Sequence, residues 1–197
     1  MGDKWTLLIV RDLVAGPRRF VELQRVLPGI STEQLRSRLN RMVADGLLTR
    51  QRYREVPPRV DYELTERSRE LVPVIAELTR WGHAWAWSPP RESEAIDVAA
   101  IFRASTGLLG GAPSGTVELR VEGRGYTLGL GGETATLAEE APGEADARIS
   151  GGEQAWIAAL GPDADRSGLE TSGATQLVDA VLDALGPTAS RATVRAA

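Results

Sequence analysis

Apolar residues recur at helical spacing in four segments of the first 87 residues. The segments run from Trp5 to Val14, from Phe20 to Leu27, from Ser31 to Asp45 and from about Thr65 to Trp85. Proline and glycine follow the first two segments as stop signals, and Ser31 with Gln34 three residues later forms a capping box at the start of the third. The pattern therefore predicts four helices.

Two strand-like runs separate the third and fourth helices. One run ends at Tyr53, and the other passes through Tyr62 and Leu64. Between them, Pro57 and Pro58 hold the backbone extended and remove two donors from any strand ladder. We therefore predict a stiff, projecting loop instead of a tight turn, and an element order of helix, helix, helix, hairpin, helix.

From residue 95 the pattern changes to a period of two. In TVELRVEGRGYTLGL, Val117, Leu119 and Val121 alternate with charged residues, a glycine-rich turn follows, and the alternation resumes at Tyr126. This segment predicts a hairpin with one apolar face. A third strand is predicted over ADARISG, and two helices over GEQAWIAALG and ATQLVDAVLDALG.

The segment AWSPPRESEA separates the two patterns. Its consecutive prolines and alternating charges are poor material for a packed element, so it marks a boundary. We predict an α+β protein of two domains, residues 1–87 and residues 95–197, joined by a linker over residues 88–94. The second domain is expected to have a small sheet with helices.

The composition excludes several classes of function. The chain has 197 residues, of which 42% are hydrophobic and 25% charged, as is ordinary for a globular protein. It has neither a run of 18 apolar residues nor a signal-like start, so we expect a cytoplasmic protein without a membrane partner. With no cysteine and a single histidine, His83, the chain offers no constellation for catalysis or metal binding. We expect no enzyme, no metal and no cofactor, and interpret His83 as structural.

Charge is divided unevenly along the chain. Residues 1–90 hold 15 basic and 11 acidic residues, a net charge of +4, whereas residues 91–197 hold 8 basic and 16 acidic residues, a net charge of −8. Such asymmetry suggests that the basic half faces a polyanion and that the acidic half has another task.

The third predicted helix has a polar face suited to reading DNA. At 100° per residue its apolar positions fall on one side, and Gln34, Ser37 and Arg41 fall opposite, with Arg38 beside them. A merely solvated face would carry more glutamate, yet Glu33 is the only acid before the last position. Polar and basic side chains donate to base edges, and helix amino ends favour phosphate. The predicted DNA-reading residues are Ser31, Thr32, Gln34, Ser37, Arg38 and Arg41.

The projecting loop carries Arg52, Arg54 and Arg59 at its base and rim. Beside a reading helix, exposed arginines are suited to contact the phosphate backbone. Three helices and such a hairpin form a winged helix-turn-helix. We therefore predict that these three arginines bind phosphate from the wing.

Residues 4–82 resemble the HxlR family of bacterial winged-helix transcription regulators, which are MarR-like. The resemblance rests on KW at residues 4–5, GPRRF at 16–20, LPGIS at 27–31, DGL at 45–47 and VPPRVDYELT at 56–65. It implies a homodimer that binds an inverted-repeat operator in double-stranded DNA, with the helix after LPGI as the reader and the EVPPR loop as the wing. Family members usually have a helix before KW, often with a cysteine, and a glycine where this chain has Ser68. Because this chain starts at the motif, we expect the dimer to rest on other surfaces.

The fourth predicted helix is the expected dimer surface. Three tryptophans between residues 81 and 87 exceed what a small core needs, and aromatic residues are enriched at interfaces. We predict subunit contacts through Leu78, Trp81 and Trp85. Packing of the tryptophans against the second domain is the alternative.

Residues 95–187 resemble the sterol-carrier-protein-like fold. The resemblance rests on ADARISGGEQAW, where a strand runs into a helix after glycines, and on LETSGATQLVDAVL, a closing strand, turn and helix. It implies an apolar tunnel, whose predicted lining residues are Leu128, Leu130, Trp156, Leu160, Val181 and Leu185. The same residues fit a solid core, so the domain is either a sensor for an apolar small-molecule effector or a dimerisation module.

A lipid or sterol carrier whose basic half is a protein-interaction adaptor is the rival function. The two functions differ in salt dependence, because phosphate contacts make affinity fall steeply with salt whereas adaptor binding need not.

Overall fold

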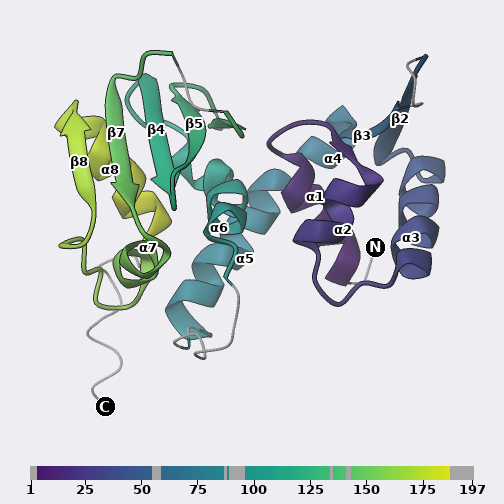
Figure 1. Ribbon diagram of the computed structural model, residues 1–197, viewed down its shortest axis with the longest axis horizontal. Coiled ribbons are helices and arrows are strands. Elements are labelled where there is room, and N and C mark those ends of the chain that lie inside the picture. Colours follow the sequence, from purple (N-terminus) through teal and green to yellow (C-terminus); the bar gives the residue numbers. More distant parts are fainter. Residues whose placement is uncertain are drawn as a thin grey trace. The chain divides into compact units, whose positions relative to one another are not determined.

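The computed structural model describes residues 4–54, 59–86, 88, 96–133, 135–140 and 143–186 (Figure 1). The chain divides into two compact units, Met1–Ile75 and Ala76–Ala197, and each has its own sheet. The division falls inside helix α5 (Val72–Trp85), ahead of the boundary expected after residue 87. Nearly all of the expected 88–94 linker lies outside the described residues.

The first unit combines helices with a three-stranded antiparallel sheet of order β1-β3-β2. In the β2–β3 hairpin, Leu48 pairs with Leu64 at the base and Tyr53 pairs with Arg59 at the outer end. The loop that joins these strands, with Pro57 and Pro58, lies outside the described residues. The elements are α1 (Lys4–Leu13), β1 (Arg18–Arg19), α2 (Phe20–Val26), α3 (Thr32–Ala44), β2 (Leu48–Tyr53), β3 (Arg59–Leu64) and α4 (Glu66–Arg69).

The fourth predicted helix is wrong as a single helix, because the structure divides it into α4 and α5. The amide of Leu71 donates to Ser68 in a tight turn at 3.1 Å. Pro73 has no amide hydrogen, so it cannot donate to a carbonyl one turn earlier and is tolerated only in a first helical turn. The chain therefore ends α4 at Arg69 and starts α5 at Val72.

Gly46 ends α3 and turns the chain into β2. Its φ of 70° lies in the left-handed region, which glycine adopts without a Cβ clash. The amide of Gly46 donates to the Val43 carbonyl at 3.1 Å, and the amide of Leu47 donates to the Met42 carbonyl at 2.8 Å. This turn satisfies the last carbonyls of α3 and keeps the hairpin beside the helix.

The core of the first unit comes from one face of each helix and from the base of the hairpin. α1, α2 and α3 bury apolar side chains against one another, as the periodicity predicts. The largest buried contributors are Ile9, Leu13, Leu23, Leu27, Leu35, Leu39 and Met42.

The second unit is a five-stranded sheet with helices. The strand order is β6-β5-β4-β7-β8, in which β4 and β7 are parallel and the other neighbours are antiparallel. The predicted hairpin, third strand and two helices are present, and β6 and α6 are additions. The elements are α6 (Val98–Ser105), the 3-10 helix η1 (Thr106–Leu109), β4 (Gly115–Val121), β5 (Arg124–Leu130), β6 (Thr136–Ala138), β7 (Ala147–Gly151), α7 (Glu153–Leu160), β8 (Glu170–Gly173) and α8 (Thr175–Leu185).

An aromatic cluster lies in the core of the second unit, where the sheet meets its helices. The Phe102 ring makes edge contacts with Trp156 and Tyr126, with ring centroids 4.9 and 5.7 Å apart. The indole of Trp156 donates to the Arg120 carbonyl at 2.8 Å, so its polar atom is satisfied although the residue is fully buried. None of the helices in the described part of the chain is long and apolar enough to cross a membrane.

Candidate nucleic-acid interface

The amino end of α3 has the predicted capping box. The amide of Gln34 donates to Ser31 Oγ at 3.1 Å, and the amide of Ser31 donates to Gln34 Oε1 at 3.2 Å. Across the preceding turn, Gln24 Nε2 donates to Thr32 Oγ1 at 2.7 Å and ties α2 to α3. Gln34 therefore uses its oxygen within the protein and keeps its amide nitrogen as a donor.

The exposed face of α3 brings the predicted reading residues together. Leu35 and its apolar neighbours are buried, whereas Ser31, Thr32, Gln34, Ser37 and Arg41 are exposed and Arg38 is half-buried. Arg41 pairs with Asp45 at 3.3 Å, one turn along the helix. Such an exposed pair is weak, so Arg41 can exchange Asp45 for another acceptor. Arg36, which the sequence interpretation omitted, is exposed beside Glu33.

The predicted wing arginines divide into two groups. Arg52 and Arg54 are exposed, and neither forms an ion pair with any residue that the structure describes. Arg59 instead pairs with buried Asp61 at 2.6 Å and stacks over Tyr53, with its guanidinium carbon 5.1 Å from the ring centroid. Arg59 therefore stabilises the hairpin, and two of the three arginines project from it.

Arg50 joins the outward-facing cations of β2. It is exposed and lies two residues before Arg52, so the two side chains leave the strand on the same face. In the sequence TRQRYR, arginine occupies every second position, and this period of two already indicated that Arg50 and Arg52 share one face of the strand.

The arginines of the GPRRF segment are bound inside the first unit. Arg18 Nε donates to the Asp12 carbonyl at 2.7 Å, and Arg19 Nε lies 3.9 Å from Asp61. The amide of Arg19 donates to Glu22 at the start of α2. These arginines hold α1, β1 and β3 together, so the net charge of the basic half overstates the charge that faces outward.

The predicted dimer residues form an exposed apolar stripe on α5, named here the α5 stripe. Leu78, Trp81 and Trp85 are 52%, 60% and 53% exposed, and Val74 continues the row. The spacing of four, three and four residues from Val74 to Trp85 is that of a heptad seam. The structure thus brings the three predicted residues onto one helix face.

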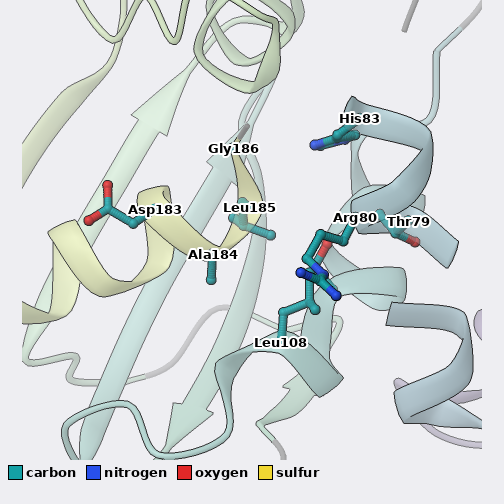
Figure 2. Close-up of a pocket in the computed structure, with 9 residues that line it drawn as sticks. Thr79, Arg80, His83, Leu108, Asp183, Ala184, Leu185 and Gly186 are labelled. Carbon is teal, nitrogen blue, oxygen red and sulfur yellow. The ribbon is translucent and has the colours of Figure 1, made fainter. Parts of the chain in front are cut away.

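The six predicted pocket residues belong to the core of the second unit. Leu128, Trp156, Leu160, Val181 and Leu185 are fully buried or nearly so, and Leu130 is half-buried. A pocket of about 180 Å³ lies elsewhere in this unit, and Leu185 is the one residue of the six that lines it (Figure 2). The described residues contain no group of three histidine, aspartate or glutamate side chains placed to hold a metal ion.

The geometry of the first unit defines a class of protein. A short helix, a tight turn, a capped helix with a polar outer face and a two-stranded wing together form the winged helix-turn-helix of DNA-binding proteins.

Comparison with known proteins gives the family. Residues 1–89 match the model of the family described as HxlR-like helix-turn-helix. The chain is 38% identical over 94 residues to the uncharacterized HTH-type transcriptional regulator YkvN of Bacillus subtilis (strain 168). The matched region covers 48% of this chain and 80% of that protein. The chain therefore belongs to the HxlR-like helix-turn-helix family.

Two further similarities each cover a little less than half of the chain. The uncharacterized HTH-type transcriptional regulator sll1512 of Synechocystis sp. is 41% identical over 85 residues, 43% of this chain and 63% of that protein. The solved structure of the reduced form of the transcriptional regulator YodB from B. subtilis is 33% identical and covers 46% of this chain and 87% of that chain, with a TM-score of 0.40.

Proposed function

We propose that the protein is a homodimeric transcription regulator that binds an inverted-repeat operator in the cytoplasm and acts by binding, without catalysis. The observation that carries this proposal is the juxtaposition, within one compact unit, of the polar face of α3 and the outward cations of β2. Helix side chains suit base edges in the major groove, and cations beside the helix suit the flanking phosphates.

The reading surface is proposed to comprise Gln34, Ser37, Arg38 and Arg41, with Ser31 and Thr32 at the helix amino end. Arg52 and Arg54 would bind phosphate from the wing. Arg59 would act mainly through the hairpin, since its guanidinium is held by Asp61 and Tyr53.

The α5 stripe is proposed as the contact between two copies of the chain. A two-fold axis places the same helix face on both subunits, so a heptad-spaced apolar row can pack against itself. Homodimerisation would bring two α3 helices to two half-sites separated by one turn of DNA.

The second unit is proposed to have a sterol-carrier-protein-like fold and to serve as a sensor or dimerisation domain. The parallel pairing of β4 with β7 and the passage from β7 into α7 through Gly151 and Gly152 support this proposal. An apolar effector held among Leu128, Trp156 and their neighbours would have to displace closely packed side chains. Effector binding there stays a prediction.

The proposed wing contacts are tested by their salt dependence. Replacing both Arg52 and Arg54 with alanine removes two phosphate contacts in each subunit and four in the dimer, so the slope of log affinity against log salt should become shallower by roughly four units on any duplex. The measurement is a salt series of fluorescence anisotropy titrations, with Arg124→Ala as a control that removes one exposed positive charge from the second unit. An unchanged slope in the double variant would contradict the wing assignment.

A further inference from the structure

The second unit contains a pocket that the predicted functions do not use (Figure 2). On α5, Thr79, Arg80 and His83 line it from the helix face opposite the α5 stripe, at 100° per residue. Its volume of about 180 Å³ slightly exceeds the roughly 150 Å³ of an apolar cavity that admits benzene. The pocket has room for a six-membered ring that carries one small polar group.

Ser105 gives this pocket an unpartnered polar group. The residue is fully buried and lines the pocket, and its Oγ has no hydrogen-bond partner among the described residues. Proteins normally pair buried hydroxyls, because an unpaired one keeps the full cost of leaving water. A ligand with a hydrogen-bonding group would supply the missing partner.

Arg80 supplies a positive charge on the same wall. Its Nε donates to Glu77 Oε2 at 2.9 Å, and its Nη2 donates to the same oxygen. In Figure 2 the side chain extends toward Leu108, and Leu185 faces it from α8. A single exposed acceptor oxygen holds this guanidinium, so a second oxyanion can share it.

Asp183, the one carboxylate among the lining residues, does not point into the pocket and so does not repel an anion bound there. Asp183 turns away from the pocket in Figure 2, and it accepts a hydrogen bond from Arg166 at 2.6 Å. His83 is uncharged at neutral pH, since burial lowers the pKa of its imidazole, and it is hydrogen-bonded to the Gly186 backbone. The remaining wall, at Leu108 and Leu185, is apolar.

We propose that this pocket binds a small carboxylate whose apolar body is about the size of a six-membered ring. The carboxylate accepts hydrogen bonds from Ser105 and Arg80, and the ring lies against Leu108 and Leu185. Because α5 carries the α5 stripe on its other face, the ligand would alter the dimer contact. That regulatory consequence rests on the proposed function, whereas the binding itself does not.

The binding test uses the full chain without DNA and two probes of nearly equal shape. Isothermal titration with cyclohexanecarboxylate should give saturable binding at least roughly tenfold tighter than with cyclohexylmethanol, because charge-assisted hydrogen bonds are the stronger ones. Absence of saturable carboxylate binding overturns the proposal, and so does equal affinity for the two probes.

Two variants with opposite expected signs test the assigned residues. Ser105→Ala should lower carboxylate affinity about three- to tenfold while leaving the melting temperature unchanged or higher, since it removes an unpartnered hydroxyl. Glu77→Gln should raise affinity roughly two- to threefold, because it releases Arg80 from a competing acceptor. Ser172→Ala, on exposed β8, is the matched control and should bind as the parent does.

Unchanged carboxylate affinity in Ser105→Ala, or weaker binding in Glu77→Gln, overturns the site. A separate operator titration keeps the two proposals distinguishable. If the protein binds the carboxylate but no operator, the pocket proposal stands and the proposed regulatory function is contradicted. If it binds an operator but not the carboxylate, the regulatory function stands and the pocket proposal is contradicted.

Discussion

At the scale of single residues, the arginines of the first unit differ in what holds them. Arg18 and Arg59 are bound to Asp12 and Asp61 within the fold, whereas Arg52 and Arg54 have no ionic partner in the described part of the chain. Sequence alone does not sort these groups, because the Asp12 carbonyl that binds Arg18 lies in another element and the Tyr53 ring beside Arg59 lies in the neighbouring strand. The outward cations are the ones that can contribute to phosphate binding and its salt dependence.

Gln34 offers a sharp test of base reading. Gln34→Glu keeps the oxygen that accepts from the Ser31 amide, so the capping box survives, but it removes the side-chain donors. We expect a loss of about 1–3 kcal/mol on the operator and a smaller loss on random duplex. The measured quantity is the ratio of the two affinities, in which the general effect of the added negative charge cancels. An unchanged ratio would remove Gln34 from the reading surface.

Because burial lowers the pKa of His83, we expect the stability of the fold to depend on pH. Burial holds the pKa of its imidazole below the ordinary 6.5, while its hydrogen bond with the Gly186 backbone raises it in part. The unfolded chain therefore binds the proton more readily, so the stability contributed by neutral His83 is complete above pH 6.5 and is lost as pH falls through the folded-state pKa. Arg80 and Asp183 are the other charged residues that line the same pocket.

The measurement is urea unfolding at pH 7.5, 6.5 and 5.5, about the interval over which histidine titrates. The free energy of unfolding of the parent should fall relative to His83→Asn as the pH is lowered. Parallel curves for the two proteins would mean that the pKa of His83 is the same in the folded and the unfolded chain, and would contradict the prediction.

At the scale of elements, α5 carries the dimer prediction. Trp81→Glu places a charge in the middle of the α5 stripe, where an apolar self-contact has no partner for it. The exposed site should keep the fold stable to within about 0.5 kcal/mol, while the dimer dissociation constant rises at least roughly tenfold.

Sedimentation equilibrium tests this prediction against the chain mass of 21.2 kDa. The parent should have about twice that mass, and Arg124→Glu, a charge reversal at the exposed first residue of β5, should behave as the parent. A parent that stays monomeric, or a Trp81→Glu variant that dimerises equally well, would contradict the α5 contact.

The elements that depend on local signals were predictable from the sequence. The capping box of Ser31 and Gln34 and the paired strands around Pro57-Pro58 follow from residues close together in the chain. The two-residue strand β1 was not predictable, since it exists only because β3 pairs with it. The break before α5 had a local signal, Pro73, which the long apolar period obscured.

The pocket, like β1, was not predictable from the sequence, because it depends on contacts between distant segments. It is formed by α5, the end of α6, η1 and the end of α8, which come from distant parts of the sequence, so no spacing of residues predicts it. The predicted pocket residues were chosen as apolar positions of strands and helices, and such positions are also those of a packed core. The edge contact between Phe102 and Trp156 shows that Trp156, one of these predicted pocket residues, packs in the core.

At the scale of the whole molecule, the chain joins a basic first half to an acidic second half. The net charges of +4 over residues 1–90 and −8 over residues 91–197 fit a division between a DNA-binding unit and a unit with another role. The family match covers residues 1–89 and so concerns the first of these. The second unit gives this HxlR-like protein a sheet and a pocket of its own.

The most direct test of sequence-specific DNA binding begins with duplexes selected from a random library by the full-length protein. We expect the selected duplexes to share an inverted repeat whose half-sites lie about one helical turn apart. Affinity for the selected duplex should exceed that for scrambled DNA by about 10³-fold or more, and both affinities should fall linearly on log axes as salt is raised. Recovery of no common sequence, or equal and salt-independent affinity for the two duplexes, would contradict sequence-specific DNA binding.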